Sequence, residues 1–102
     1  MRLGKKQELF SELFAELITY IYSQGYQVRL GDTFAHDRHK KNSNHYIKLA
    51  GDINLFKDGK FLTKNSDHEQ FGVFWESLHR FCRWGARFGD GNHYSLIHNR
   101  RM

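Results

Sequence analysis

The chain has 102 residues, a formal net charge of +5 and a single cysteine. A chain of this length has room for one core, so we expect one domain over residues 1–102. The hydrophobic fraction of 39% and the aromatic fraction of 16% exclude a disordered chain. The lone Cys82, which we expect to be buried, excludes an internal disulfide and a thiolate metal cluster.

Targeting signals and net charge limit where the chain could act and what it could bind. No run approaches the roughly 18 apolar residues of a membrane span, and the N-terminus lacks the pattern of a signal peptide. We therefore expect no membrane insertion and synthesis in the cytoplasm. The pI of about 9.5 favours a polyanionic partner, which could be nucleic acid or an anionic cell wall.

The first part of the chain predicts a helix and a strand. Between Lys5 and Gln24, apolar residues recur at three- and four-residue steps, which is typical of an amphipathic helix, and Gly25 would end it. Alternation over Tyr26–Leu30 predicts a strand. The polar residues 32–44 predict a long surface loop.

The second part predicts a hairpin, a helix and a final strand. Leu49–Phe56 has strand character, and Asp58-Gly59 marks a hairpin turn after it. Helical spacing runs from about His68 to Trp84, with Asp67 as a plausible N-cap. Asn92–Ile97 predicts a short last strand, so the fold class is α+β with two main helices.

Asp52 is the most unusual residue in these elements, because it lies in the middle of an otherwise apolar strand. A carboxylate there is costly to bury unless it is paired or binds a metal. His45 lies seven positions earlier, on the opposite face of a continuous strand. The chain must therefore bend between His45 and Leu49 if both side chains are to reach one ion.

A metal that activates water needs three protein ligands and one open position. His45, Asp52 and His93 would supply two imidazoles and a carboxylate. Asp90 would then be left as a general base, on a turn that Gly89 and Gly91 make pliable. This pattern indicates a small zinc hydrolase, with structural histidines and an ordinary turn aspartate as the alternative.

The spacing Ser-x-His-x6-Asp, followed late in the chain by Asp-x-x-His, resembles a family of zinc peptidases. These include VanY-type D-alanyl-D-alanine carboxypeptidases and phage L-alanyl-D-glutamate endopeptidases. The likeness to compact phage members covers roughly the last sixty residues, through the stretches SNHYIKLAGDINLFKDGKFLT and FWESLHRFCRWGARFGDGNHYSL. It implies a small antiparallel sheet packed with helices, as in hedgehog and DD-peptidase folds.

Carried over by position, the resemblance makes His45, Asp52 and His93 the zinc ligands and Asp90 the general base. Ser43 would help to hold the substrate. The implied reaction is hydrolysis of a peptidoglycan stem-peptide bond by a phage or prophage endolysin, which acts on the cell wall after its release. We expect a monomer.

Three positions depart from the family pattern. The substrate-binding arginine of the family would fall near Ala35, with Arg29 and Arg38 as stand-ins. A glutamate common two residues after the last ligand is Ser95, and a glycine common three residues after the first ligand is Lys48. The first two departures concern substrate geometry, and neither removes a metal ligand.

Two other functions compete with hydrolysis. Basic charge with scattered tyrosine and phenylalanine would also serve a nucleic-acid-binding module, although no fingerprint motif for one is present. The departures at Ala35 and Ser95 would suit a non-catalytic relative that only binds the cell wall.

Overall fold

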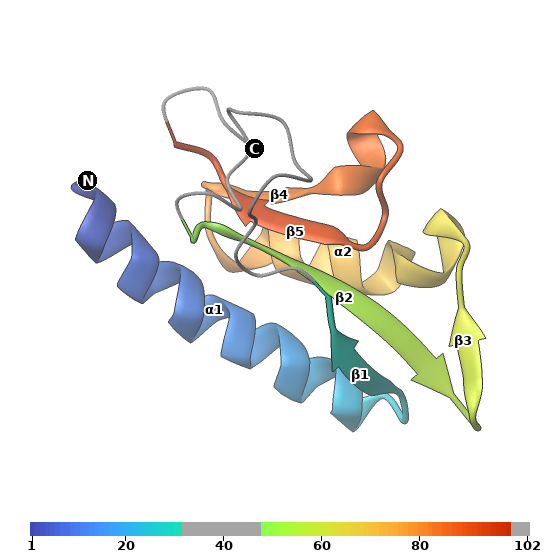
Figure 1. Ribbon diagram of the computed structural model, residues 1–102. Helices are drawn as coiled ribbons and strands as arrows, with labels where there is room; N and C mark the ends of the chain where they lie inside the picture. Colours follow the sequence, from blue (N-terminus) through green and yellow to red (C-terminus); the bar gives the residue numbers. More distant parts are fainter. Residues whose placement is uncertain (32–47, 99–102) are drawn as a thin grey trace.

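The structure is a computed structural model that describes residues 1–31 and 48–98 (Figure 1). Within these ranges the chain forms two α-helices and a five-stranded sheet, which confirms the predicted α+β class. The helices are α1 (Leu3–Ser23) and α2 (Glu69–Leu78). The strands are β1 (Gln27–Leu30), β2 (Ala50–Lys57), β3 (Lys60–Leu62), β4 (Cys82–Trp84) and β5 (His93–Leu96). Two 3-10 turns, η2 (Asn65–His68) and η3 (Gly85–Phe88), flank α2 and β4.

The long strand β2 is the centre of the sheet (Figure 1). β1 pairs with it along one edge. On the other edge, β5 pairs with Ala50–Asp52 and β3 pairs with Leu55–Lys57, so these two short strands follow each other along β2. β4 extends the sheet beyond β5, and all four pairings are antiparallel.

Both helices pack on one face of this sheet. Alternate β2 residues point toward them, and Gly51 lies so close to α1 that a Cβ atom there would come within 2.7 Å of the Phe14 ring. From α2, the Trp75 indole donates hydrogen bonds of 3.1 Å to the carbonyls of Arg83 and Ser95. The buried core contains Phe10, Leu13, Phe14, Leu17, Ile21, Leu49, Ile53, Leu55, Phe71, Trp75, Cys82, Tyr94 and Leu96.

The hairpin between β2 and β3 has the predicted two-residue turn. Asp58 and Gly59 have φ values of 51° and 78°. Positive φ at both central positions is the geometry of a type I′ turn, whose twist matches that of the paired strands. The Asp-Gly dipeptide therefore fixes the register of this hairpin.

The predicted helix from His68 to Trp84 is wrong at its C-terminal end. α2 stops at Leu78, because His79 is extended with φ −162° and ψ 149°, and Cys82–Trp84 forms β4 instead. Phe81 and Cys82 follow Leu78 by three and four residues, so the helical spacing of apolar residues continues past the point where the helix ends. The predicted capping role of Asp67 is also different, since its carboxylate accepts from the Lys64 N–H at 2.9 Å, ahead of η2.

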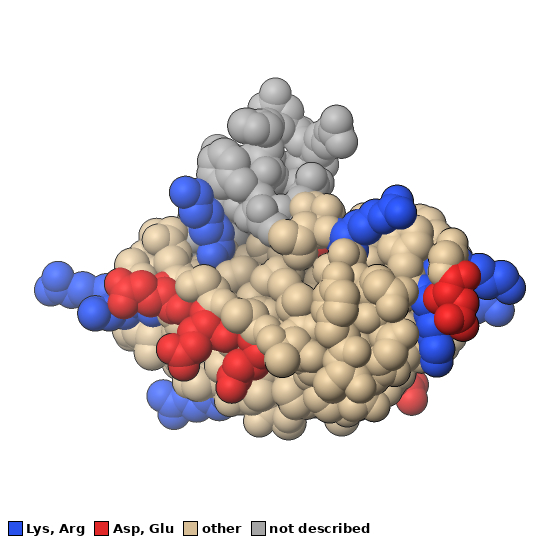
Figure 2. All heavy atoms as spheres, turned by 90° about the horizontal axis from the view of Figure 1, so that it is seen from below, with Lys and Arg blue, Asp and Glu red and all other residues tan. Residues whose placement is uncertain are grey.

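Surface charge and hydropathy bear on the alternative functions. Figure 2 shows basic side chains scattered around the periphery of one face, with acidic side chains grouped beside some of them. The described basic residues therefore form no continuous patch on this face of the kind that nucleic acid binding requires. Within residues 1–31 and 48–98, no helix is long and apolar enough to cross a membrane.

The close approach of α2 to β4 gives a stability test at Gly72. A Cβ atom there would overlap the indole ring of Trp84, whereas nothing lies within 4 Å of a Cβ atom at Gly4 of α1. We expect Gly72→Ala to lower the free energy of unfolding by about 1–3 kcal/mol, since a tightly packed contact is overfilled. Gly4→Ala should leave it unchanged or raise it by up to about 1 kcal/mol. Urea denaturation measures both, and equal effects would contradict the packing.

Candidate metal centre

Asp52 and His93 face each other across the pairing of β2 with β5. They are direct partners in the register, on the sheet face opposite the helices. Their side chains approach to 3.3 Å between Asp52 Oδ1 and His93 Nδ1. Gly31 lies beyond Asp52 on the other edge, where its N–H donates to the Asp52 carbonyl at 2.8 Å. A Cβ atom at Gly31 would come within 3.0 Å of Asp52 Cβ, so the glycine leaves space beside the carboxylate.

Asp90 comes from the turn that leads into β5. Its N–H donates to the Gly85 carbonyl at 2.9 Å, and its own carbonyl accepts from the His93 N–H at 3.1 Å. The neighbouring Gly91 donates its N–H to Asn65 Oδ1 at 2.9 Å, and its carbonyl accepts from the Trp84 indole at 2.6 Å. These four hydrogen bonds hold the turn that was predicted to be pliable.

Gly91 has a packing role in this turn. A Cβ atom at Gly91 would lie 2.6 Å from Asn65 Oδ1, so only glycine lets the turn approach η2 this closely. The contact holds the Asp90 backbone beside the start of β5. The sequence indicated flexibility at a position where glycine is needed for close approach.

Asp52, Asp90 and His93 together form a group that could hold a metal ion. One ligand atom from each lies within 4.8 Å of the other two. Two ligands of a tetrahedral zinc ion are about 3.3 Å apart for bonds of about 2 Å, which matches the separation between Asp52 and His93. One imidazole and two carboxylates also suit other transition metals, so this donor set fits a divalent ion without selecting zinc.

The two carboxylates of the group differ in their surroundings. The side chain of Asp52 is 16% exposed and that of His93 is 5% exposed. Asp90, in contrast, is exposed on its turn. A nearly buried carboxylate requires a compensating partner, and His93 or an ion at the same place would provide it.

Three other predicted site residues lie outside the described residues, namely His45, Ser43 and Arg38. Of the segment between His45 and Leu49, where a bend was predicted, the structure describes Lys48. It has a φ of 58°, in the left-handed region, two residues before β2 begins. Such a residue redirects the chain and costs an L-residue other than glycine roughly 1–2 kcal/mol.

Arg29, the remaining predicted substrate contact, lies on β1 opposite Asn54. This register places it on the sheet face that carries Asp52 and His93. Its guanidinium carbon lies 4.2 Å from the centre of the Phe56 ring. Because Asn54 is two residues beyond Asp52 on β2, Arg29 flanks the group rather than joining it.

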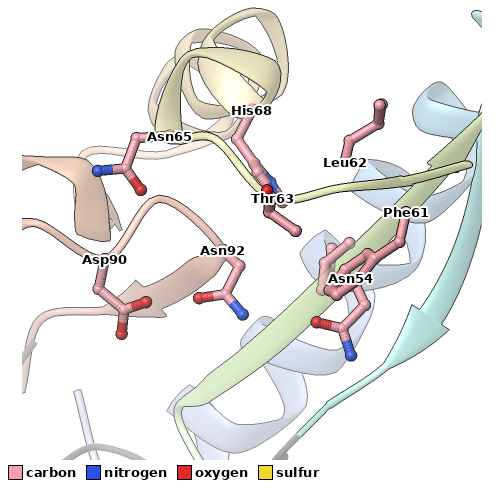
Figure 3. Close-up of a pocket in the computed structure, with 9 residues that line it drawn as sticks. Asn54, Phe61, Leu62, Thr63, Asn65, His68, Asp90 and Asn92 are labelled. Carbon is pink, nitrogen blue, oxygen red and sulfur yellow. The ribbon is translucent and has the colours of Figure 1, made fainter.

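A cleft of about 200 Å³ adjoins Asp90 (Figure 3). It lies where the edge of β2 passes from its pairing with β5 to its pairing with β3. Its described lining comes from β2, the β3–η2 segment and the turn before β5: Ile53, Asn54, Phe61, Leu62, Thr63, Asn65, His68, Asp90 and Asn92. No spacing pattern connects these residues with the metal ligands, so this cleft was not predicted.

His68 is the histidine in this lining that the sequence reading missed as a site residue. It is 3% exposed, and its Nδ1 shares a hydrogen bond of 2.8 Å with the Tyr94 hydroxyl. Burial lowers the pKa of His68 to about 4, although the negative charge of Asp67 raises it. The ring is therefore neutral near pH 7. A histidine directly ahead of an apolar helical run was the only sequence feature that marked it.

Cys82 is 1% exposed, as predicted, and burial raises the pKa of its thiol to about 12. The thiol is therefore neutral and unsuited to metal binding. This agrees with a site made from histidine and carboxylates.

The chain matches no protein-family model, and a search of curated proteins found no significant relative. The resemblance to zinc peptidases therefore depends on the motif residues and on the geometry around them.

The low pKa of His68 predicts a pH-dependent loss of stability. An unfolded histidine titrates near pH 6.5, so the stabilising effect of the neutral ring is fully present above that pH. It is lost as the pH falls toward about 4, because the unfolded state binds the proton first. Between pH 7 and pH 4, wild type should lose on the order of 2 kcal/mol more than His68→Gln. Urea denaturation of metal-free protein measures this, and equal losses would contradict it.

Proposed function

We propose that the chain is a zinc-dependent peptidase that hydrolyses a bond in the peptidoglycan stem peptide. The observation that carries the proposal is the approach of ligand atoms of Asp52, Asp90 and His93 to within 4.8 Å of one another. In the proposal, His45 completes a ligand set with Asp52 and His93, and Asp90 is the general base.

The division of roles follows from the surroundings of each side chain. Asp52 and His93 come from paired strands, which hold their backbones in a fixed register. This rigidity suits ligands, whose positions must be set before the ion binds. Asp90 is exposed on a turn beside the cleft, where a carboxylate can reach both water and a substrate.

Zinc in such a site supplies a Lewis acid that polarises a carbonyl group and acidifies water. The residues of the chain then have two tasks. Asp90 accepts the proton of the attacking water and later delivers it to the leaving amine. The hydrogen bonds that hold the turn place the Asp90 backbone beside His93.

Lys48 supports the family assignment within this proposal. The related peptidases often have glycine at the equivalent position, three residues after the first ligand. Here that position has a φ of 58°, which glycine adopts without the steric cost of a Cβ atom. A shared backbone bend explains why the family pattern has glycine at this place, and why His45 and Asp52 could converge despite their odd spacing.

Substrate binding in the proposal uses the same face of the sheet. Arg29 lies on β1 opposite Asn54, which is two residues beyond Asp52 on β2. Arg29 is exposed, so it could bind a carboxylate of the stem peptide. Ser43 and Arg38 remain predicted contacts. Both an L-alanyl-D-glutamate endopeptidase and a D-alanyl-D-alanine carboxypeptidase fit these residues, in the setting of a phage or prophage endolysin.

Substitution of the two carboxylates separates metal binding from proton transfer. We expect Asp90→Ala to retain one zinc ion and to lose hydrolysis by about 10²–10⁴-fold, because only the base is removed. Asp52→Ala and His45→Ala should lose both zinc and activity. Elemental analysis of the purified protein gives the zinc content, and mass spectrometry of products from cell-wall sacculi gives the activity and the bond cut.

Asp58→Asn is the matched control, since this aspartate lies in the exposed β2–β3 turn. It should retain both zinc and hydrolysis. Zinc loss in Asp90→Ala would make Asp90 a ligand, whereas full activity would remove it as the base. Zinc bound without hydrolysis by wild type would favour the non-catalytic wall-binding alternative.

A further inference from the structure

The cleft beside Asp90 has two kinds of wall (Figure 3). Phe61 and Leu62 provide an apolar side. The amide side chains of Asn54 and Asn92 and the imidazole of His68 provide hydrogen-bonding groups that are neutral near pH 7. Asp90 is the one ionised side chain among the described lining residues.

A hydrogen bond at Nδ1 fixes the orientation of the His68 ring. The Tyr94 hydroxyl binds Nδ1 at 2.8 Å, and Tyr94 itself is fully buried. Nε2 makes no hydrogen bond within the described part of the chain, and the ring forms part of the cleft wall (Figure 3). Because Nδ1 is held by Tyr94, Nε2 is the ring nitrogen left to bond a ligand in the cleft.

The chemistry of the walls matches a peptide group. A neutral imidazole offers one donor or one acceptor and no charge, and an asparagine side chain offers both. A main-chain amide presents the same complementary pair, while Phe61 and Leu62 can cover the small apolar groups of neighbouring residues.

We propose that this cleft binds the segment of the peptide substrate next to the scissile bond, and that His68, oriented by Tyr94, hydrogen-bonds a main-chain amide of that segment. The inference rests on the proposed function, because it takes Asp90 as the group that meets the scissile bond. His68 is a positioning residue in this proposal, and it neither binds the metal nor transfers a proton.

The test compares His68→Ala and His68→Gln with wild type on a soluble muropeptide that carries a complete stem peptide. His68→Ala should raise KM or lower kcat/KM by about fivefold to tenfold, the expected loss of one neutral hydrogen bond. His68→Gln, which retains a donor and an acceptor, should recover part of this loss. Zinc affinity, measured separately, should be unchanged. His79→Ala is the matched control, because His79 bonds the Phe81 N–H and does not line the cleft.

A binding measurement separates failure of this inference from failure of the proposed function. In ¹H–¹⁵N spectra, the same muropeptide should shift the side-chain amide signals of Asn54 and Asn92 in wild type, and less in His68→Ala. If wild type shows these shifts but hydrolyses nothing, the peptidase proposal fails and the cleft assignment stands. If hydrolysis occurs and His68→Ala has wild-type kinetics, the assignment is overturned. Absence of any shift in wild type also overturns it.

Discussion

The register of β2 against β5 is the constraint on which the candidate site depends. It places Asp52 directly opposite His93 on the face away from the helices. A shift of one residue would turn one of these side chains into the core and bring an apolar residue such as Tyr94 out of it. The same alternation that buries Ile53 and Tyr94 therefore presents the two polar side chains together. The hydrophobic core and the site are fixed by one pairing.

Several contacts from outside the two strands maintain this register. The Trp75 indole bonds the carbonyls of Arg83 and Ser95, which ties α2 to both β4 and β5. Gly51 lets the Phe14 ring of α1 lie against β2. These contacts lie close to the candidate ligands, because Gly51 is next to Asp52 and Ser95 is two residues from His93.

Local patterns in the sequence predicted most of the fold. Alternation along the strand placed Asp52 on the face opposite Ile53 and Leu55. The Asp58-Gly59 dipeptide identified the hairpin turn. Both features depend on short-range backbone geometry. The end of α2 was mispredicted because Phe81 and Cys82 continue the three- and four-residue spacing from Leu78, although the chain is already extended at His79. Likewise, Gly91 was read as a flexible position, since its close contact with Asn65 joins segments distant in the sequence.

The candidate site shows the same limit on local reasoning. Asp52 could be identified because it interrupts an apolar strand, and His93 because it ends the Asp-x-x-His pattern, whereas His68 gained importance only when η2 was brought against Tyr94 and the cleft. The His68 ring is neutral because it is buried, and this burial cannot be inferred from residue spacing. The residues that define a metal site can thus be visible in sequence, while those that shape the adjoining substrate cleft become visible only in the packed structure.

The contrast between the two carboxylates suggests how one small sheet can hold both an ion and a proton acceptor. Asp52 is nearly enclosed and faces an imidazole, so its negative charge is best stabilised by a cation at a fixed place. Asp90 is exposed, so its carboxylate can exchange protons with solvent at little cost in desolvation. Enzymes that use paired carboxylates rely on this kind of difference in environment to assign separate roles. Here the difference arises because one aspartate lies within a paired strand and the other on the turn that leads into the next.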